Sequence, residues 1–542
     1  MAVNNGVVYK TILDAIAASH KKPYLQNDSS DDRLSYKATH ASANATLSFQ
    51  LMTRAEPPEL VIATIQSLLA VKDANDEILI IDNNNTETSL YEPLAAFCAS
   101  SDPALNVHFY HIDDVVGFKA GALNLALGLM NPNCTHLVVV DSDYQALPHA
   151  RTSIANAIKC YPNHTLLQFP QFYRNAGQVN AHSELNHYFN HHLYRPFNRE
   201  RALSTGTYAV IRRANLLSLG GWSGASITED AQMGVLMHQK GFLSKFIPEV
   251  IATGLLPNTL DDLMCQRRRW IYGNMQVLNN YLSSALLLKR QQSPEKSIIK
   301  CLAYTRSHLS QLSAWMNLTG LFILLHIASV LIIGSAIFNI QIFDRIADLS
   351  LLTPLYLVYA SYTFFLLRRL WAYFHDRAPL NKQINEDYRP SIKKSLRAWL
   401  MHLNFWELGA LSWLPVLWGS EKPFICTPKQ AYIRSRRSLR QANLVALPKL
   451  LLVLNIITAL IVAPFSPFYS PILSVCAVAI CILKISAAKV AFDNFTVPEQ
   501  RPTTISIKSK PAVATGRKQT KSLMPSELKI DTVFEDKKTI NS

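Results

Sequence analysis

Residues 136–143 read His-Leu-Val-Val-Val-Asp-Ser-Asp, an apolar, mostly β-branched run that ends in two carboxylates. Such a run is typical of a strand buried in a parallel sheet, and we predict a strand over 136–140. Charged side chains at the carboxyl end of a buried parallel strand lie where open α/β sheets bind their ligands. The stretch therefore predicts an α/β fold with a polar site at Asp141 and Asp143.

The segments before this strand alternate between short apolar runs and helix-like stretches. They are 47–52, 58–70, 77–82, 90–99, 107–111 and 117–129. This alternation predicts βαβ units and a parallel sheet. We expect the α/β domain to span residues 45–290, after a polar segment, 1–44, that lacks the apolar stretch of a secretory signal.

The second half of the chain is more apolar than the first. Four of its apolar runs are long enough to span a bilayer, namely 315–338, 351–367, 447–465 and 471–488. A fifth run, 398–418, contains polar residues and has basic residues on both flanks, so we predict that it is re-entrant or interfacial. These features predict an α-helical membrane domain over 291–497 and a disordered basic tail over 498–542.

Basic residues outnumber acidic ones by 53 to 38, which gives a formal net charge of +15. They cluster beside the apolar runs, and the positive-inside rule assigns such flanks to the cytoplasmic side. We therefore expect a multi-pass protein of the inner (cytoplasmic) membrane, in contact with the lipid bilayer, whose α/β domain is cytoplasmic. No nucleic-acid-binding element accompanies the charge, and we expect no nucleic acid partner. The cysteines form no C-x-x-C pair, which argues against a disulfide scaffold or a structural zinc site.

Two acidic patterns suit group transfer. Asp141 and Asp143 offer hard oxygen ligands for Mg²⁺ or Mn²⁺, which a nucleotide-sugar diphosphate needs to become a leaving group, although such pairs also cap strand ends. Thr228-Glu229-Asp230 precedes a helical stretch, and in a direct displacement one carboxylate must take the proton from the acceptor hydroxyl. The same pattern is as common in the first turn of ordinary helices. Each pattern alone therefore leaves a structural alternative open.

A third pattern, Gln266-x-x-Arg269-Trp270, brings an amide, a guanidinium and an indole within two helical turns. Arg can clamp a diphosphate, an amide can hydrogen-bond a sugar, and an indole face can stack on a pyranose ring. The alternative is a membrane-surface anchor, which Arg and Trp residues also form. These three residues alone do not decide between the two.

The order and spacing of these three patterns, with Asp82 upstream, resemble the D, DxD, TED and QxxRW signature of processive family 2 glycosyltransferases such as bacterial cellulose synthase. Residues 117–124, Gly-Phe-Lys-Ala-Gly-Ala-Leu-Asn, match the family's K-A-G-x-L-N helix start, and 206–212 with 220–222 match the approach to TED. Residues 424–429, Phe-Ile-Cys-Thr-Pro-Lys, look like the family's gating-loop motif, F-x-V-T-x-K, in a loop expected at 421–430. The resemblance implies a GT-A-type α/β domain plus an α-helical transmembrane domain.

The resemblance also assigns side chains to the donor. Those that would bind its nucleotide or diphosphate are Asp82, Lys119, Asp141, Arg269, Thr427 and Lys429. Asp141 and Asp143 would in addition bind the metal, Mg²⁺ or Mn²⁺.

Further residues are assigned to catalysis and to the acceptor. Asp230 would be the general base, and Thr228 and Glu229 would shape its surroundings. Gln266 and Trp270 would bind the acceptor, with Trp270 as its platform.

Two departures from the family pattern bear on the product. Asp82 is followed by Asn83-Asn84 rather than by Asp and Gly, and residues 204–207, Ser-Thr-Gly-Thr, stand where cellulose synthases have F-C-G-S. With Gly117-Phe118-Lys119, these changes resemble the bacterial β-1,3-glucan-synthase-like branch, and they leave the linkage open.

The reaction implied by the resemblance is inverting transfer from a UDP-sugar, with UDP-glucose the expected donor and a growing β-linked glucan the acceptor. The resemblance does not indicate whether export of the glucan, if it occurs, needs a partner protein or a homo-oligomer. One alternative is a non-processive transferase that makes a lipid-linked sugar. Another, from a different class, is an inactive membrane scaffold, against which the intact acidic patterns and Trp270 argue.

Overall fold

A computed structural model of the chain describes residues 45–174, 189–194, 200–257, 260–288, 296–314, 319–337, 353–375, 380, 383, 391–409, 411–417, 419, 453–455, 457 and 470–495. The chain divides into two units, Met1–Val497 and Pro498–Ser542. Three predicted segments, 1–44, 421–430 and 498–542, lie outside the described residues, and so do Thr427 and Lys429.

A seven-stranded sheet organises the α/β domain, in the order β3-β2-β1-β4-β7-β6-β8. Its strands are β1 (Leu47–Thr53), β2 (Glu77–Asp82), β3 (Val107–His111), β4 (His136–Asp141), β6 (His164–Gln168), β7 (Ala209–Arg212) and β8 (Leu243–Phe246). The first four strands in this order are parallel, which confirms the predicted parallel sheet there. β7 differs, because it runs antiparallel to both β4 and β6.

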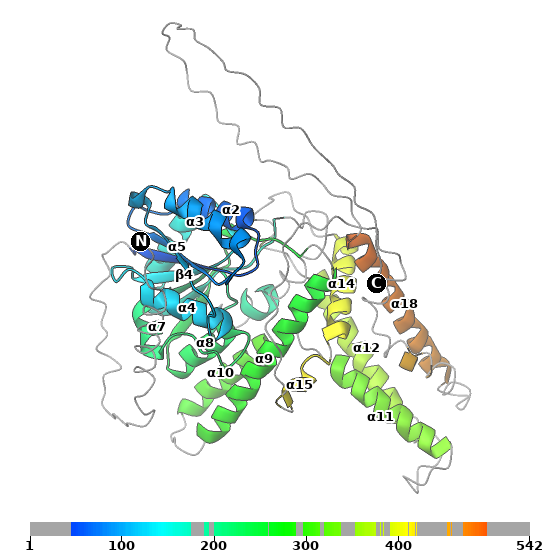
Figure 1. Cartoon of the computed structure of the whole chain (residues 1–542). Coiled ribbons are helices and arrows are strands. Elements are labelled where there is room, and N and C mark those ends of the chain that lie inside the picture. Colours follow the sequence, from blue (N-terminus) through cyan, green and yellow to red (C-terminus); the bar gives the residue numbers. More distant parts are fainter. Residues whose placement is uncertain are drawn as a thin grey trace, which may run out of the picture. The chain divides into compact units, whose positions relative to one another are not determined.

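Helices cover both faces of this sheet (Figure 1). They are α2 (Pro58–Leu69), α3 (Thr88–Ala99), α4 (Phe118–Leu129), α5 (Ala150–Cys160), α7 (Arg213–Leu219) and α8 (Glu229–Gln239). Buried residues of α2, α3 and α5 pack with Phe49 and Ile80 on one face. Residues of α4, α7 and α8 pack with Leu137 and Val139 on the other face. The central strands β1, β2 and β4 are buried at nearly every position, on both faces, as expected for a three-layer α/β/α domain.

Several short elements complete the domain. A two-stranded sheet pairs β5 (Gln145–Ala146) with β9 (Ala252–Thr253) in antiparallel fashion. The remaining short helices are η2 (Pro103–Leu105) and η3 (Phe189–Tyr194). β5 begins two residues after Asp143, so the β5–β9 pair fixes the segment that follows Asp141 and Asp143.

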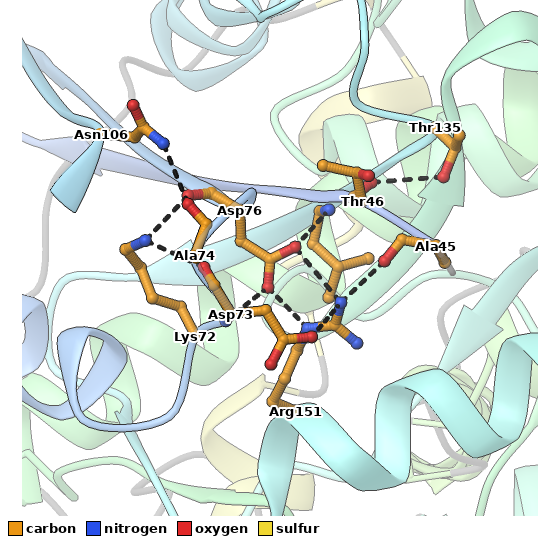
Figure 2. A network of polar contacts seen from close by, with 10 residues as sticks. Ala45, Thr46, Lys72, Asp73, Ala74, Asp76, Asn106, Thr135 and Arg151 are labelled. Atoms are coloured by element: carbon orange, nitrogen blue, oxygen red, sulfur yellow. Dashed lines mark hydrogen bonds and ion pairs between the residues drawn. The ribbon is translucent and has the colours of Figure 1, made fainter. Parts of the chain in front are cut away.

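A buried ion pair fastens the amino end of β1 (Figure 2). Arg151 Nε on α5 donates to Asp76 Oδ2 over 2.6 Å, and Arg151 Nη2 donates to the Ala45 carbonyl over 2.7 Å. Asp76 Oδ1 accepts a hydrogen bond of 2.8 Å from Leu47 N. Because both charged side chains are buried, each depends on the other for compensation of its charge. This contact holds the sheet at the end opposite to the ligand-binding edge.

The rest of the described chain is helical. It comprises α9 (Leu260–Leu288), α10 (Lys296–Leu312), α11 (Thr319–Ile337), α12 (Thr353–Phe374), α14 (Ile392–Gly409), α15 (Leu414–Leu417) and α18 (Ser470–Phe495). Among the described residues, no helix combines the length and the apolar character needed to cross a membrane. The predicted spans and the predicted interfacial segment, 398–418, stay predictions.

Candidate active site

The carboxyl edge of the parallel strands carries the first two predicted site residues. Asp141 is the last residue of β4 and lies beside Met52 of β1. Its backbone N–H donates to Thr207 Oγ1 over 3.0 Å. Asp143 follows two residues later, and its Oδ2 accepts a hydrogen bond of 2.8 Å from Leu255 N. The Thr207 hydroxyl thus fixes the backbone of Asp141, and a backbone N–H fixes the carboxylate of Asp143, at the edge of the sheet.

A cavity of about 240 Å³ opens at this edge. The ends of β1 and β4, the starts of α4 and α8, and α9 contribute to its wall. The predicted site residues that line it are Lys119, Asp141, Asp143, Thr228, Glu229, Asp230, Gln266, Arg269 and Trp270. The cavity therefore brings together residues that are far apart in the chain. Lys119 and Trp270, for example, are 151 positions apart.

Lys119 joins the two acidic patterns. Its Nζ lies 2.5 Å from Asp141 Oδ1 and 4.0 Å from Glu229 Oε1. Burial alone would lower the pKa of Lys119, but the charges of Asp141 and Glu229 outweigh it and raise that pKa above its ordinary value. Lys119 therefore remains protonated and offsets part of the negative charge in the cavity.

Asp230 lies in the first turn of α8, next to Glu229 in the chain. Gly206 faces its carboxylate closely: a Cβ at Gly206 would lie 3.4 Å from Asp230 Oδ2. Burial is the main cause that raises the pKa of Asp230 to about 7, and the Glu229 charge adds to it. Burial likewise raises the pKa of Glu229. A carboxylate with a pKa near 7 is suited to accept a proton at neutral pH.

α9 carries the third predicted pattern, Gln266-x-x-Arg269-Trp270. Gln266 is buried, and its Oε1 accepts a hydrogen bond of 2.7 Å from Arg267 Nη1. The Arg267 guanidinium stacks over the Trp270 ring, 4.1 Å from the ring centroid. Arg267 holds the indole in place, because the two side chains lie three residues apart on one face of the helix. Sequence reasoning missed Arg267, although this spacing is the signal that could have found it.

Asp82 is the one described residue among the predicted site residues that does not line the cavity. It ends β2, its side chain is fully buried, and its Oδ2 lies 2.7 Å from His111 Nδ1. Asn84 donates to both oxygens of Asp82, from Nδ2 over 2.5 Å and from its backbone N over 3.2 Å. Asn83 and Phe118 line the cavity instead, and neither was among the predicted site residues.

Comparison with protein families decides the class. Residues 136–485 match the model described as "Glycosyl transferase family group 2", and residues 51–220 match "Glycosyl transferase family 2". This chain is a family 2 glycosyltransferase. It belongs to the sugar-nucleotide-dependent transferases, and its α/β domain has the GT-A-type fold of that family.

Curated relatives of this glycosyltransferase include polysaccharide synthases. "Putative cellulose synthase 2" of Komagataeibacter xylinus is 29% identical over 170 residues, 30% of this chain and 11% of that protein. "Poly-beta-1,6-N-acetyl-D-glucosamine synthase" of Staphylococcus aureus (strain COL) is 24% identical over 238 residues, 43% and 55% of the two chains. The matches therefore cover less than two thirds of either relative.

One solved structure similar to this glycosyltransferase is "Mannosyltransferase PcManGT from Pyrobaculum calidifontis in complex with GDP-Man and Mn2+". The likeness has a TM-score of 0.41 and 15% sequence identity, and it covers 70% of this chain and 99% of that chain.

The acidic edge of the glycosyltransferase fits a hard divalent ion. Asp141 and Asp143 come from one strand end, and both line the cavity. Asp141 is 32% exposed at its side chain, so it can be reached. Within the part of the chain that the structure describes, no three His, Cys, Asp or Glu side chains are arranged as a metal site. Asp141 and Asp143 would supply two carboxylate ligands, and a bound diphosphate would have to supply further oxygen ligands.

Proposed function

We propose that this glycosyltransferase transfers glucose from UDP-glucose, with inversion at the anomeric carbon, to the end of a growing β-linked glucan. The observation that carries the proposal is the convergence of Lys119, Asp141, Glu229 and Asp230 on one cavity that Trp270 also lines. A cation beside a carboxylate pair suits a diphosphate leaving group, and a carboxylate with a raised pKa suits the activation of a hydroxyl.

Asp230 is the group that activates the acceptor in this proposal. It takes the proton from the acceptor hydroxyl while that oxygen attacks the anomeric carbon from the face opposite the diphosphate. The new C–O bond forms as the bond from the anomeric carbon to the phosphate oxygen breaks, and the configuration inverts. The electron pair of the broken bond leaves with UDP.

The leaving diphosphate gains negative charge in this step. Lys119 and Arg269 both line the cavity, and their charges favour the product diphosphate. Asp141 and Asp143 would hold Mg²⁺ or Mn²⁺, which would neutralise the diphosphate as it leaves. Thr427 and Lys429 lie outside the described residues, and their closure over the donor stays a prediction.

Trp270 offers a platform for the acceptor sugar. Its indole is fixed from one side by Arg267, 4.1 Å from the ring centroid, and it lies at the cavity wall. A rigid aromatic face of this kind packs against the apolar face of a pyranose ring. Gln266 lies one helical turn before Trp270 and also lines the cavity, and an amide next to a stacking surface suits the terminal sugar of a glycan.

We further propose that the helices after α10 anchor the protein in the inner membrane, with the α/β domain in the cytoplasm. On α12, Leu357, Phe364 and Trp371 recur every seven residues and are 63%, 68% and 65% exposed. On α18, Val475 and Ile482 show the same spacing and are 67% and 58% exposed. Exposed apolar stripes of this kind suit contact with lipid chains.

The deciding experiment uses purified protein in lipid vesicles with radiolabelled UDP-glucose and Mg²⁺, followed by linkage analysis of the product. We expect a labelled β-glucan that a β-glucan-specific hydrolase degrades, and no product from Asp230→Asn. Addition of a single sugar to lipid would instead support the non-processive alternative. Absence of transfer from every UDP-sugar tried would refute the proposed donor class.

A further inference from the structure

α10 follows α9 in the chain and packs against both α8 and α9 (Figure 1). Its side chains also contact the segment 201–207, which leads into β7. α8, α9, α10 and this segment all contribute residues to the cavity wall. One apolar cluster joins the four parts, and its members include Leu203, Val235, Val277 and Leu312. α10 therefore borders every element that surrounds Asp230.

Gln311 of α10 holds the backbone of the segment 201–207 through both atoms of its amide. Its Oε1 accepts a hydrogen bond of 2.7 Å from Leu203 N, and its Nε2 donates to the Arg201 carbonyl over 2.8 Å. Arg201 has φ +59°, a left-handed value that is costly for a residue with a side chain and persists only where the surrounding contacts fix it. Gln311 is 1% exposed, so water does not compete for these bonds. The two bonds thus fix the strained turn from both sides.

The segment that Gln311 holds lies directly against α8. A Cβ on Gly234 of α8 would lie 3.0 Å from Ser204 N, so the helix and the segment touch with no room for a side chain between them. Two residues further on, Gly206 faces Asp230, because a Cβ at Gly206 would lie 3.4 Å from Asp230 Oδ2. A shift of the segment would therefore change the space around the Asp230 carboxylate.

His308, one turn before Gln311, fastens α10 to α8 itself. His308 Nε2 lies 2.7 Å from His238 Nδ1, and His238 Nε2 lies 2.7 Å from Ser244 Oγ at β8. Burial lowers the pKa of His238 to about 3 and the pKa of His308 to about 4, so at neutral pH both rings are neutral and one donates to the other. A single turn of α10 thus fixes α8 and the segment 201–207 at the same time.

We propose that α10 is a positioning helix for the general base, with Gln311 and His308 as the positioning residues. Gln311 fixes the segment whose Gly206 faces Asp230, and His308 fixes the helix that carries Asp230. Gln311 lines the cavity, but its amide is engaged by the protein backbone, so it acts through Asp230. Proton transfer requires Asp230 within hydrogen-bond reach of the acceptor hydroxyl. The inference rests on the proposed function, in that Asp230 must be the base.

The first test replaces Gln311 by Met, which keeps the length of the side chain but forms neither hydrogen bond. A displacement of about 1 Å can cost about a hundredfold in rate, so we expect kcat to fall by about tenfold to a hundredfold. KM for UDP-glucose and the affinity for UDP should change by less than about twofold, because the contact between Lys119 and Asp141 is untouched.

The pH dependence of kcat tests whether Gln311 acts through Asp230. Release of the segment admits water to Asp230, and since burial is what raises the pKa of this group to about 7, that pKa should fall. The pH of half-maximal kcat should therefore lie below that of the wild type in Gln311→Met. The other charges that act on Asp230, those of Glu229, Lys119 and Asp141, remain in the variant.

A second pair of variants replaces His308. Gln can place a polar atom near the position of the histidine Nε2, so His308→Gln can keep the contact with His238, whereas His308→Leu cannot. We expect His308→Leu to lower kcat as Gln311→Met does, and His308→Gln to recover most of it. Thermal unfolding shows that each variant is folded, and the His308 pair decides the question if Gln311→Met does not fold.

Arg306→Gln is the matched control, because Arg306 lies on α10, is exposed and does not line the cavity. It should leave kcat, KM and the pH profile unchanged. Wild-type kcat in Gln311→Met and His308→Leu, an equal loss of UDP affinity, or an unshifted pH profile would refute the positioning role and leave the proposed function standing. A wild-type protein that transfers sugar from none of the UDP-sugars would refute both.

Discussion

Replacing Asp230 by Asn separates a catalytic base from a helix-capping acid, because the two roles predict opposite changes in stability. Raising the pKa of Asp230 from an ordinary 3.8 to about 7 corresponds to about 4 kcal/mol of unfavourable free energy for the ionised form. Between these two values the folded protein holds a proton that the unfolded chain has lost. The free energy of unfolding therefore falls as the pH rises from about 4 to 7, and it stays lower above 7.

Asp230→Asn removes this ionisation, so at pH 8 we expect it to unfold at the same temperature as the wild type or higher. Turnover should fall by about a hundredfold to ten-thousandfold, as is typical when a general base is lost, while UDP binding changes little. Thermal unfolding from pH 4 to 8, transfer assays and UDP titration measure the three quantities.

Glu59→Gln is the matched control for this experiment, because Glu59 is an exposed acid in the first turn of α2 and does not line the cavity. It should leave turnover unchanged. Loss of an acid that caps a helix lowers the free energy of unfolding by about 1 kcal/mol. If Asp230→Asn had this effect at pH 8 and kept most of its turnover, Asp230 would be a capping residue and not the base.

Three more predictions concern the metal, the fold and pH. Asp143→Asn should abolish transfer without unfolding the protein, and EDTA should do the same to the wild type; full activity in either case would contradict a metal role for Asp143. Arg151→Ala leaves the buried Asp76 without its partner and should lower the free energy of unfolding by about 3–5 kcal/mol in urea titrations, with the UDP affinity of the folded protein unchanged. The kcat of the wild type should rise with pH to a plateau above about 7, as Asp230 ionises, and a kcat that stays flat from pH 5 to 8 would exclude Asp230 as the base.

The parallel part of the sheet could be predicted from the sequence because its strands are short apolar runs bounded by polar turns. The runs at 47–52, 77–82 and 107–111 each became a strand, as did the run that ends at Asp141. Helix starts were predictable to within two residues at Pro58 and at Glu229 for a similar reason, since proline and acidic residues favour the first turn. These features depend on residues close in the chain.

Features that depend on distant residues were not predicted. β7 is antiparallel to β4, and the sequence of a four-residue strand does not indicate the direction in which it pairs. The sequence pattern does not indicate that His111, 29 residues away, and Asn84 contact the oxygens of Asp82, and the role of Asp82 in binding the nucleotide stays a prediction. The exposure of Phe118 depends on the left-handed backbone at Gly117 and Phe118, which the K-A-G-x-L-N pattern does not include.

The balance of charge in the cavity explains why donor binding and catalysis make conflicting demands on Asp230. Besides Asp230, the carboxyl groups there belong to Glu56, Asp141, Asp143 and Glu229, and the cations are Arg54, Lys119 and Arg269. An ionised Asp230 adds negative charge where a diphosphate must bind, so the donor is favoured by the protonated form and proton abstraction by the ionised form. A pKa of about 7 lets both forms exist at neutral pH. In the proposed function, a divalent ion that binds with the donor would offset the added charge, which is a physical reason for Asp141 and Asp143 to bind one.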